Sequence, residues 1–206
     1  MRAMSSLPGV ALFGPPRCVV CRHRADWLCA TCRAAARPPQ EDLVIRDVTR
    51  AVAPWAYEGG PRSLVLALKL RGLRGAAEPL VDAMVRCSGR SALDPTTITW
   101  VPARRRDKAR RGFDHAEVLA RGVAAGLGGT ALPLLERRGH QADQAGLDRA
   151  HRLGNLRSAF VAADGVPGSV LLCDDLVTTG ATAAACATAL RSAGARRVEV
   201  LVACRR

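Results

Sequence analysis

Two adjacent carboxylates followed by small hydroxyl residues form the part of this sequence with the clearest chemistry. Asp174 and Asp175 come directly after an apolar run. The small residues that follow them are Thr178, Thr179, Gly180, Ala181 and Thr182. A turn of this kind at a helix start offers unpaired backbone N–H groups to a phosphate, and upstream carboxylates suit the hydroxyls of a ribose. The segment therefore predicts a sugar-phosphate site.

Each part of this segment also has an ordinary structural explanation, because Asp-Asp can end a strand and Thr-Thr can cap a helix. The order of apolar run, paired acids, Thr/Gly turn and helix favours the phosphate site. No other phosphate-binding motif fits this sequence as well. The pattern GxxxxGK[ST] is absent, and residues 126–131 (GLGGTA) formally fit GxGxxA but follow a helical pattern, where the motif requires a strand.

A second candidate region is the basic run at residues 102–111, PARRRDKARR, in which six of the eight residues 104–111 are Arg or Lys. It follows an apolar strand pattern and precedes a helical one. We expect a loop whose cations, Arg104, Arg105 and Arg111, neutralise a diphosphate. A solvated loop or a nucleic-acid-binding patch stays open, since nothing in the run fixes a geometry.

Four cysteines form two CxxC pairs separated by a short span: Cys18, Cys21, Cys29 and Cys32. This spacing predicts a tetrahedral Zn²⁺ site, structural because four ligands leave no open position, with His23 as a bystander. A thioredoxin-like redox pair would need a surrounding strand–helix–strand pattern, which the segment lacks. The other four cysteines are scattered in apolar contexts, which favours buried thiols over a disulfide framework: Cys87, Cys173, Cys186 and Cys204.

The elements that must position these groups alternate between strand and helix patterns. Strand patterns lie at residues 49–57, 97–101, 158–162, 169–173 and 198–203, and helical patterns at 64–70, 80–89, 116–125 and 180–193. The alternation predicts an α/β fold with a mostly parallel sheet flanked by helices and with ligands at the carboxyl ends of the strands. We expect two units, an N-terminal extension with a zinc ribbon at 1–37 and the main domain at 38–206.

The composition indicates an ordinary globular protein with an unusual charge. Hydrophobic residues make up 49% and aromatic residues 3% of the 206, so the core must be aliphatic. The net charge of +13 favours polyanionic partners. A high-GC genome would explain why only Lys69 and Lys108 are lysines among 31 basic residues, but not the net charge. No apolar stretch reaches the roughly 18 residues of a membrane span, and no convincing cleavage site follows the start, which predicts a cytoplasmic protein.

Several pieces of the chain resemble one family in order and spacing. They are the CxxC pairs, Leu68-Lys69 with Arg71-Gly72, Val101-Pro102, Arg111-Gly112-Phe113, Gln144 with Leu147, Arg152 with Asn155, Ala159-Phe160 and VLLCDDLVTTGAT at 170–182. The last resembles the signature of type I phosphoribosyltransferases for 5-phosphoribosyl 1-diphosphate (PRPP). Together they resemble the ComF/GntX family of competence-associated phosphoribosyltransferase-like proteins, from Cys18 onward.

The resemblance implies a type I phosphoribosyltransferase fold that binds PRPP, with Asp174 and Asp175 on the ribose, residues 178–182 on the 5′-phosphate and Mg²⁺ on the diphosphate. It also implies a role in DNA uptake. Two functions stay open. One is an enzyme that transfers ribose 5-phosphate to an unidentified acceptor. The other is a non-catalytic PRPP sensor or scaffold that works with single-stranded DNA or DNA-processing proteins. The sequence predicts neither the acceptor nor an oligomeric state.

Two positions depart from the family pattern. Residues 111–115 read RGFDH where the family usually has RGFNQ, and residues 100–103 read WVPA in place of the usual PVP run. Asp114 puts in doubt any role that needs an amide donor there. His115 is interpreted as a helix-start residue in preference to a catalytic base.

The arginine-rich stretch at 136–157 corresponds by position to the mobile hood that closes over the substrate in such folds and excludes water. Arg152 and Asn155 are the candidate hood residues. A surface helix with ordinary ion pairs is the alternative.

Overall fold

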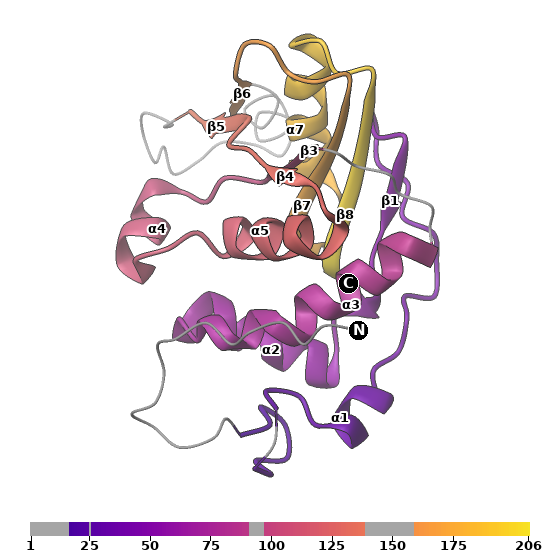
Figure 1. Cartoon of the computed structure of the whole chain (residues 1–206), viewed down its shortest axis with the longest axis vertical. Coiled ribbons are helices and arrows are strands. Elements are labelled where there is room, and N and C mark those ends of the chain that lie inside the picture. The colour runs from indigo at the N-terminus through magenta and orange to yellow at the C-terminus, as the bar shows by residue number, and fades with distance from the viewer. Residues whose placement is uncertain (1–16, 25, 91–96, 139–158) are drawn as a thin grey trace, which may run out of the picture.

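A six-stranded sheet forms the centre of the computed structural model, which describes residues 17–24, 26–90, 97–138 and 159–206 (Figure 1). The strand order is β1-β8-β7-β3-β4, with β2 also paired to β8, and every pairing described in this sheet is parallel. The strands are β1 (Arg50–Val52), β2 (Trp55–Ala56), β3 (Thr97–Trp100), β4 (Thr130–Ala131), β7 (Ser169–Val177) and β8 (Arg197–Arg205). The predicted α/β fold class is confirmed.

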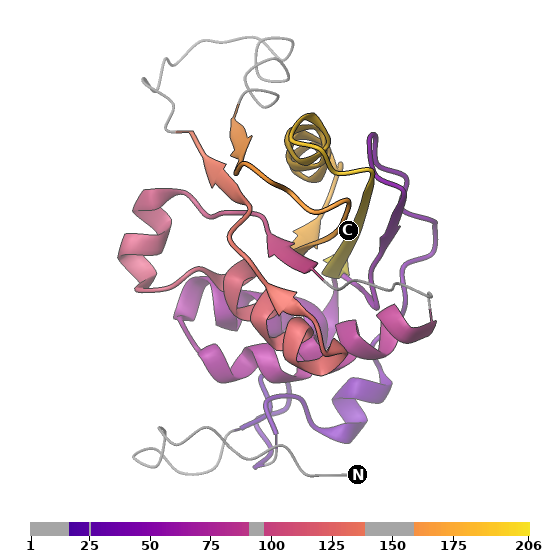
Figure 2. The same cartoon turned by 45° about the horizontal axis from the view of Figure 1, so that its top comes forward.

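Helices cover both faces of this sheet (Figure 1 and Figure 2). On one face, Leu171 and Leu201 pack in an apolar cluster with α2 (Gly59–Arg71), α3 (Ala77–Arg90) and α5 (His115–Leu127). On the other face, the neighbouring residues Leu172 and Val200 pack in a second cluster with α7 (Ala181–Ser192). Successive side chains of a strand point to opposite faces, so a strand buried on both faces is apolar throughout. This explains the continuous apolar runs in the sequence.

Two strands differ from the sequence prediction. The strand expected at 49–57 is split into β1 and β2 at Ala53-Pro54, since proline has no N–H to donate to the ladder. The strand expected at 169–173 runs on to Val177, so the acid pair lies within β7 and not after it.

The loop expected at the basic run is wrong, because Arg105–Arg111 form the helix α4. Arg, Lys and Ala all favour helix, and Asp107 in the first turn complements the helix dipole. Gly112, with a left-handed φ of +75°, ends the helix.

A two-stranded antiparallel ribbon lies beside the main sheet. It pairs β5 (Leu135–Arg137), which was not predicted, with β6 (Phe160–Ala162), which was. The intervening residues 139–158 lie outside the described part of the chain, and with them most of the predicted hood, including Gln144, Arg152 and Asn155. Among the described helices, none is long and apolar enough to cross a membrane.

The cysteine segment, residues 18–24 and 26–34, lies against α2, on the side away from the sheet (Figure 1). It contains the short helix α1 (Ala30–Ala34), and the 3-10 turn η1 (Arg74–Ala76) follows α2. Cys18 and Leu28 are fully buried and belong to the same apolar cluster as the helices α2, α3 and α5. The segment is therefore packed directly on the main domain.

Candidate functional site

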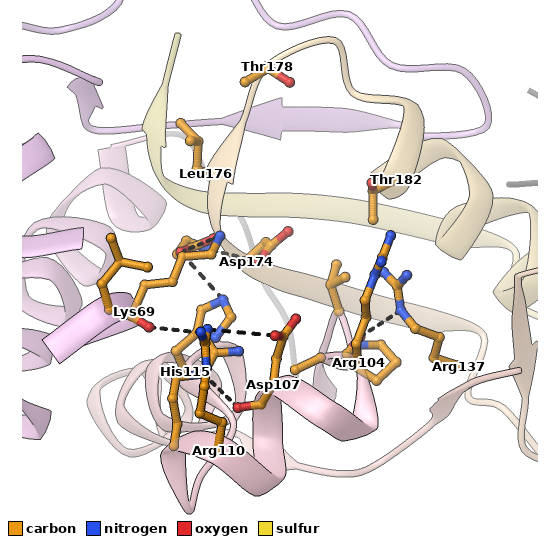
Figure 3. Close-up of a pocket in the computed structure, with 16 residues that line it drawn as sticks. Lys69, Arg104, Asp107, Arg110, His115, Arg137, Asp174, Leu176, Thr178 and Thr182 are labelled. Atoms are coloured by element: carbon orange, nitrogen blue, oxygen red, sulfur yellow. Dashed lines mark hydrogen bonds and ion pairs between the residues drawn. The ribbon is translucent and has the colours of Figure 1, made fainter. Parts of the chain in front are cut away.

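A cavity of about 370 Å³ lies beyond the carboxyl ends of β3 and β7, where parallel sheets bind ligands. Its acidic and hydroxyl lining comes mainly from β7, the turn after it and the first turn of α7, with one acid from α4: Asp174, Asp175, Thr178, Thr182 and Asp107. Its cationic lining comes from α2, from α4 with its N-cap, and from β5: Lys69, Arg104, Arg110, Arg111 and Arg137. Figure 3 shows Lys69 beside Asp174 on one side and Arg104 and Arg137 near Thr182 on the other. The cavity thus joins both candidate regions of the sequence.

Asp175 is the most buried charge in the cavity, with 2% of its side chain exposed. Lys69 Nζ lies 3.3 Å from Oδ1 and 3.1 Å from Oδ2, and His115 Nε2 lies 3.4 Å from Oδ2. Burial on its own would raise the pKa of Asp175, but the contacts with His115 and the charge of Lys69 together lower it below its ordinary value. Asp175 therefore stays ionised.

The pKa of Asp174 is shifted in the opposite direction. Its Oδ1 accepts a hydrogen bond of 2.8 Å from the backbone N–H of Asp175, and it forms no ion pair with any residue that the structure describes. Burial and, next, the charge of Asp175 raise the pKa of Asp174 well above its ordinary value. The second carboxylate of the pair is therefore harder to ionise than the first, and a cation next to Asp174 would favour its ionised form.

The turn after β7 leads directly into the N-terminus of α7. Gly180 has a left-handed φ of +74°, which favours glycine, and an added Cβ there would crowd Cγ1 of Ile45 at 3.0 Å. Thr178 and Thr179 are exposed. The first backbone N–H groups of α7 have no partner within the helix. Of the predicted phosphate-binding residues, Thr178 and Thr182 line the cavity, whereas Thr179, Gly180 and Ala181 do not.

Only some of the basic residues of α4 and its N-cap, Arg104, reach the cavity. Arg104, Arg110 and Arg111 line the cavity. The structure does not bring Arg105 there, because its Nη2 lies 3.2 Å from Oε1 of Glu136 on β5.

Two nitrogen atoms of Arg111 donate hydrogen bonds to backbone carbonyl groups of the chain. Its Nε donates to the carbonyl of Asp107 at 3.0 Å and its Nη1 donates to the carbonyl of Lys69 at 3.0 Å. This guanidinium therefore ties α4 to α2. Its catalytic role stays a prediction.

The departures at Asp114 and His115 have a structural explanation. Asp114 caps α5, since its Oδ1 accepts from the N–H of Ala116 at 3.1 Å and its Oδ2 accepts from the N–H of Ala103 at 2.8 Å. An acceptor serves here where an amide was expected. His115 is the first residue of α5, as predicted, and in addition faces Asp175.

Sequence reasoning missed the roles of Lys69 and Arg137. Lys69 stood in one of the motifs that carried the resemblance, which was the available signal. Arg137 lies over the ring of Phe160 at 4.6 Å and donates from Nε to the carbonyl of Pro102 at 3.3 Å. Burial and, next, the charge of Arg104 lower the pKa of Arg137. Arg137 lies in the arginine-rich stretch 136–157 expected as a hood, but nothing in that stretch singled it out from the other arginines.

The four N-terminal cysteines form a second candidate site. Their sulfur atoms lie within 4.8 Å of one another, and Cys21 Sγ is 3.7 Å from Cys29 Sγ. Tetrahedral zinc with bonds of about 2.3 Å places its sulfurs about 3.8 Å apart, whereas a disulfide needs about 2 Å. The geometry fits the predicted metal site, formed by Cys18, Cys21, Cys29 and Cys32.

The pKa values of these thiols diverge. Burial would raise the pKa of Cys18, but backbone N–H groups of Cys29, Cys21 and Val20 lower it to about 6. Hydrogen bonding to the thiol of Cys29, with burial and the other thiols, raises the pKa of Cys32 to about 12. All four thiols can ionise together only with a cation among them.

Three of the remaining cysteines are buried thiols outside any disulfide, as predicted: Cys173, Cys186 and Cys204. Burial raises the pKa of each of these three. Cys87 is only partly buried, which differs from the prediction.

The sequence matches no protein-family model and no curated protein. Among solved structures, the chain is similar to the allosteric regulatory enzyme of purine biosynthesis, at 26% identity over 61% of this chain and 25% of that chain, with a TM-score of 0.44. It is also similar to the glutamine PRPP amidotransferase from B. subtilis complexed with ADP and GMP, at 26% identity over 60% of this chain and 25% of that one, with a TM-score of 0.43. The chain thus spans a quarter of the length of each.

Proposed function

We propose that this chain binds PRPP in the cavity and transfers ribose 5-phosphate from it to an acceptor. The observation that supports this is the joint lining of one cavity by Asp174, Asp175, Thr182 and several arginines. The carboxylates accept from the ribose hydroxyls, the turn before α7 receives the 5′-phosphate, and the arginines receive the diphosphate. Each part of the ligand thus has a chemical counterpart.

Mg²⁺ fits this arrangement on the acidic side. Asp174 offers a carboxylate with no ion pair among the described residues, and its pKa is raised by burial and by the neighbouring charge of Asp175. Carboxylate and phosphate oxygens are the ligands that Mg²⁺ prefers. The ion would lie with the diphosphate next to Asp174, and when bound it supplies charge neutralisation of the leaving group.

The transfer breaks the bond between C1 of the ribose and a diphosphate oxygen, which leaves with the electron pair. Arg104 and Arg137 stabilise the charge that develops on this oxygen. The ionised carboxylate of Asp175 lies on the ribose side, where positive charge develops on the ring. The acceptor then forms a bond to C1 and releases its proton.

Calorimetry with PRPP and Mg²⁺ tests the proposal. The double variant Asp174→Asn, Asp175→Asn should lose PRPP affinity by more than about tenfold, because hydrogen bonds to charged groups are lost. A matched control, Asp164→Asn, lies on an exposed turn and should bind like the wild type. An unchanged affinity in the double variant would contradict the ribose assignment. Released diphosphate, measured with a pool of nucleobases and single-stranded DNA, identifies the acceptor class.

A second candidate function is a PRPP-binding scaffold that holds single-stranded DNA, in line with the resemblance to the ComF/GntX family. The observation that favours it is the exposure of the α4 cations, among them Arg104, Arg105 and Arg106. Aromatic residues are too few for a long stacking platform. Fluorescence anisotropy should give weak, steeply salt-dependent binding that PRPP competes with and that falls when all three arginines become alanine. Salt-insensitive binding would argue against it.

The finer assignments from the sequence belong to the same proposal. They are membership of the ComF/GntX family, a division at residues 1–37 and 38–206, a cytoplasmic location, a structural Zn²⁺ and a role in DNA uptake.

A further inference from the structure

The cysteine segment and the helix α2 meet in a close-fitting interface. Cys18 and Leu28 are fully buried with Leu64 and Leu68 of α2. An added Cβ at Gly60, in the first turn of α2, would lie 2.8 Å from Cδ1 of Leu28. Real Cβ atoms do not approach other atoms this closely, so a side chain at this position would force Leu28 to move.

The same segment also touches the turn that follows α2. A Cβ at Gly75, in η1, would overlap the indole of Trp27, with Cε2 at 2.6 Å. Arg33 of α1 adds an ion pair of 3.7 Å to Asp82 of α3. The segment therefore braces α2 at its start and just beyond its end.

Lys69 links the braced helix to the cavity. It lies in the last turn of α2, and its Nζ is 3.1 Å from Oδ2 of Asp175. Its carbonyl accepts the hydrogen bond from Arg111 that ties α2 to α4. A shift of α2 would thus withdraw the cation from a carboxylate that is 2% exposed and would loosen the basic wall.

The segment has little of its own to hold Trp27 and Leu28 in place. The helix α1 has five residues and none of them is buried. An element this short has no independent stability, so its conformation depends on cross-linking of the four cysteines by a bound metal.

We propose that the four-cysteine cluster is a positioning element of the cavity: with metal bound, it fixes Trp27 and Leu28 against α2 and η1 and so holds Lys69 against Asp175. The affinity for PRPP then depends on the cluster, although none of the described residues that line the cavity is a cysteine. The inference rests on the proposed function only for the identity of the ligand.

The test uses the zinc-loaded full chain with Gly75→Ala. The new methyl displaces Trp27, a side chain, without touching the cysteines or a positive φ. Metal analysis should give unchanged zinc, and calorimetry with Mg²⁺ should give PRPP binding weaker by about fivefold, the size of coupling between contacting elements. Gly89→Ala is the matched control, since no described atom lies within 4 Å of its Cβ, and it should bind like the wild type. Equal affinity in Gly75→Ala and the wild type overturns the proposal.

A double-mutant cycle separates positioning from general destabilisation. In a Lys69→Met background, Gly75→Ala should cause no further loss of affinity, because its effect passes through Lys69. In an Arg104→Ala background it should still cause the full loss. A full loss in both backgrounds overturns the proposal. If Gly75→Ala does not fold, Trp27→Phe, which removes part of the same contact, replaces it.

Failure of the proposed function gives a different result, in which the zinc-loaded wild type binds no PRPP at all. Hydrogen–deuterium exchange then tests the inference without a ligand. Amides of residues 59–71 should exchange faster in Gly75→Ala than in Gly89→Ala. Identical exchange in the two variants overturns the proposal.

Discussion

Replacing Lys69 by methionine removes the lysine charge that faces the most buried carboxylate of the cavity while keeping the length of the side chain. Asp175, 2% exposed, would then face only His115 Nε2 at 3.4 Å. Removing one partner of a fully buried pair costs about 3–5 kcal/mol. Lys69 is itself 38% exposed and His115 remains, so water and the imidazole offset part of this cost. We expect the free energy of unfolding to fall by about 2 kcal/mol at neutral pH.

The loss should depend on pH in a definite direction. The folded chain holds the pKa of Asp175 below its ordinary value, so the ionised carboxylate contributes stability above the unfolded-state pKa of about 4. That contribution disappears as the pH falls through the lowered value. Without Lys69, burial raises the pKa of Asp175 and the contribution is smaller. The difference between the variant and the wild type is therefore largest at neutral pH and shrinks below about pH 4.

Urea unfolding followed by tryptophan fluorescence at neutral and acidic pH measures this difference. Lys108→Met is the matched control, because Lys108 is the other lysine of the chain and forms an exposed pair of 3.6 Å with Glu117. It should change stability by less than about 0.5 kcal/mol. Lys69→Met with Asp175→Asn should be more stable than Lys69→Met alone, since no buried charge is left unpaired. A pH-independent loss, or a double variant less stable than the single one, would refute this reasoning.

Three further predictions concern the two candidate sites. Because the raised pKa of Asp174 lets a proton compete with the cation, PRPP affinity in Mg²⁺ should fall as the pH falls through that pKa, and calorimetry should find this dependence weakened in Asp174→Asn. Metal analysis should give one zinc per chain in the wild type and none with Cys21→Ser and Cys32→Ser, and a full equivalent there would contradict the site. Arg104→Ala should weaken PRPP binding by about tenfold, whereas Arg105→Ala, whose side chain faces Glu136, should change it less than about twofold in the same titration.

The order of strands and helices could be predicted because a parallel sheet buries its strands on both faces and leaves continuous apolar runs. The end of β7 could not be predicted from the sequence. Acids usually mark the end of an apolar run, yet Asp174 pairs with Val202 and Leu176 with Cys204, so the ladder to β8 continues through them. At the basic run, the expected ligand favoured a loop, whereas the helix propensity of Arg, Lys and Ala favoured α4. Propensity was the better guide there.

Some residues of the site could be predicted from one short segment of sequence, whereas others could not because they meet only in the folded chain. The acid pair and the turn before α7 are contiguous in the sequence, so one segment is enough to predict their chemistry. Lys69 lies 106 positions before Asp175, and their contact exists only because α2 packs against the sheet. Arg137 reaches the cavity from the β5–β6 ribbon. Such meetings depend on tertiary packing, which no short motif encodes.

Under the proposed function, the crowding of cations in the cavity gives a reason for a polyanion to bind in preference to other ligands. Arg137 has its pKa lowered by burial and by the charge of Arg104, so the two guanidinium groups repel each other when no anion lies between them. Carbonyl groups stabilise this wall only in part: Pro102 accepts from Arg137, while Asp107 accepts from Arg111. A diphosphate relieves the repulsion and binds the arginines at the same time. Under the proposed function, we therefore expect the affinity for PRPP to come mainly from this wall and to fall with salt, and the selection of a ribose to come from the acid pair on the opposite side.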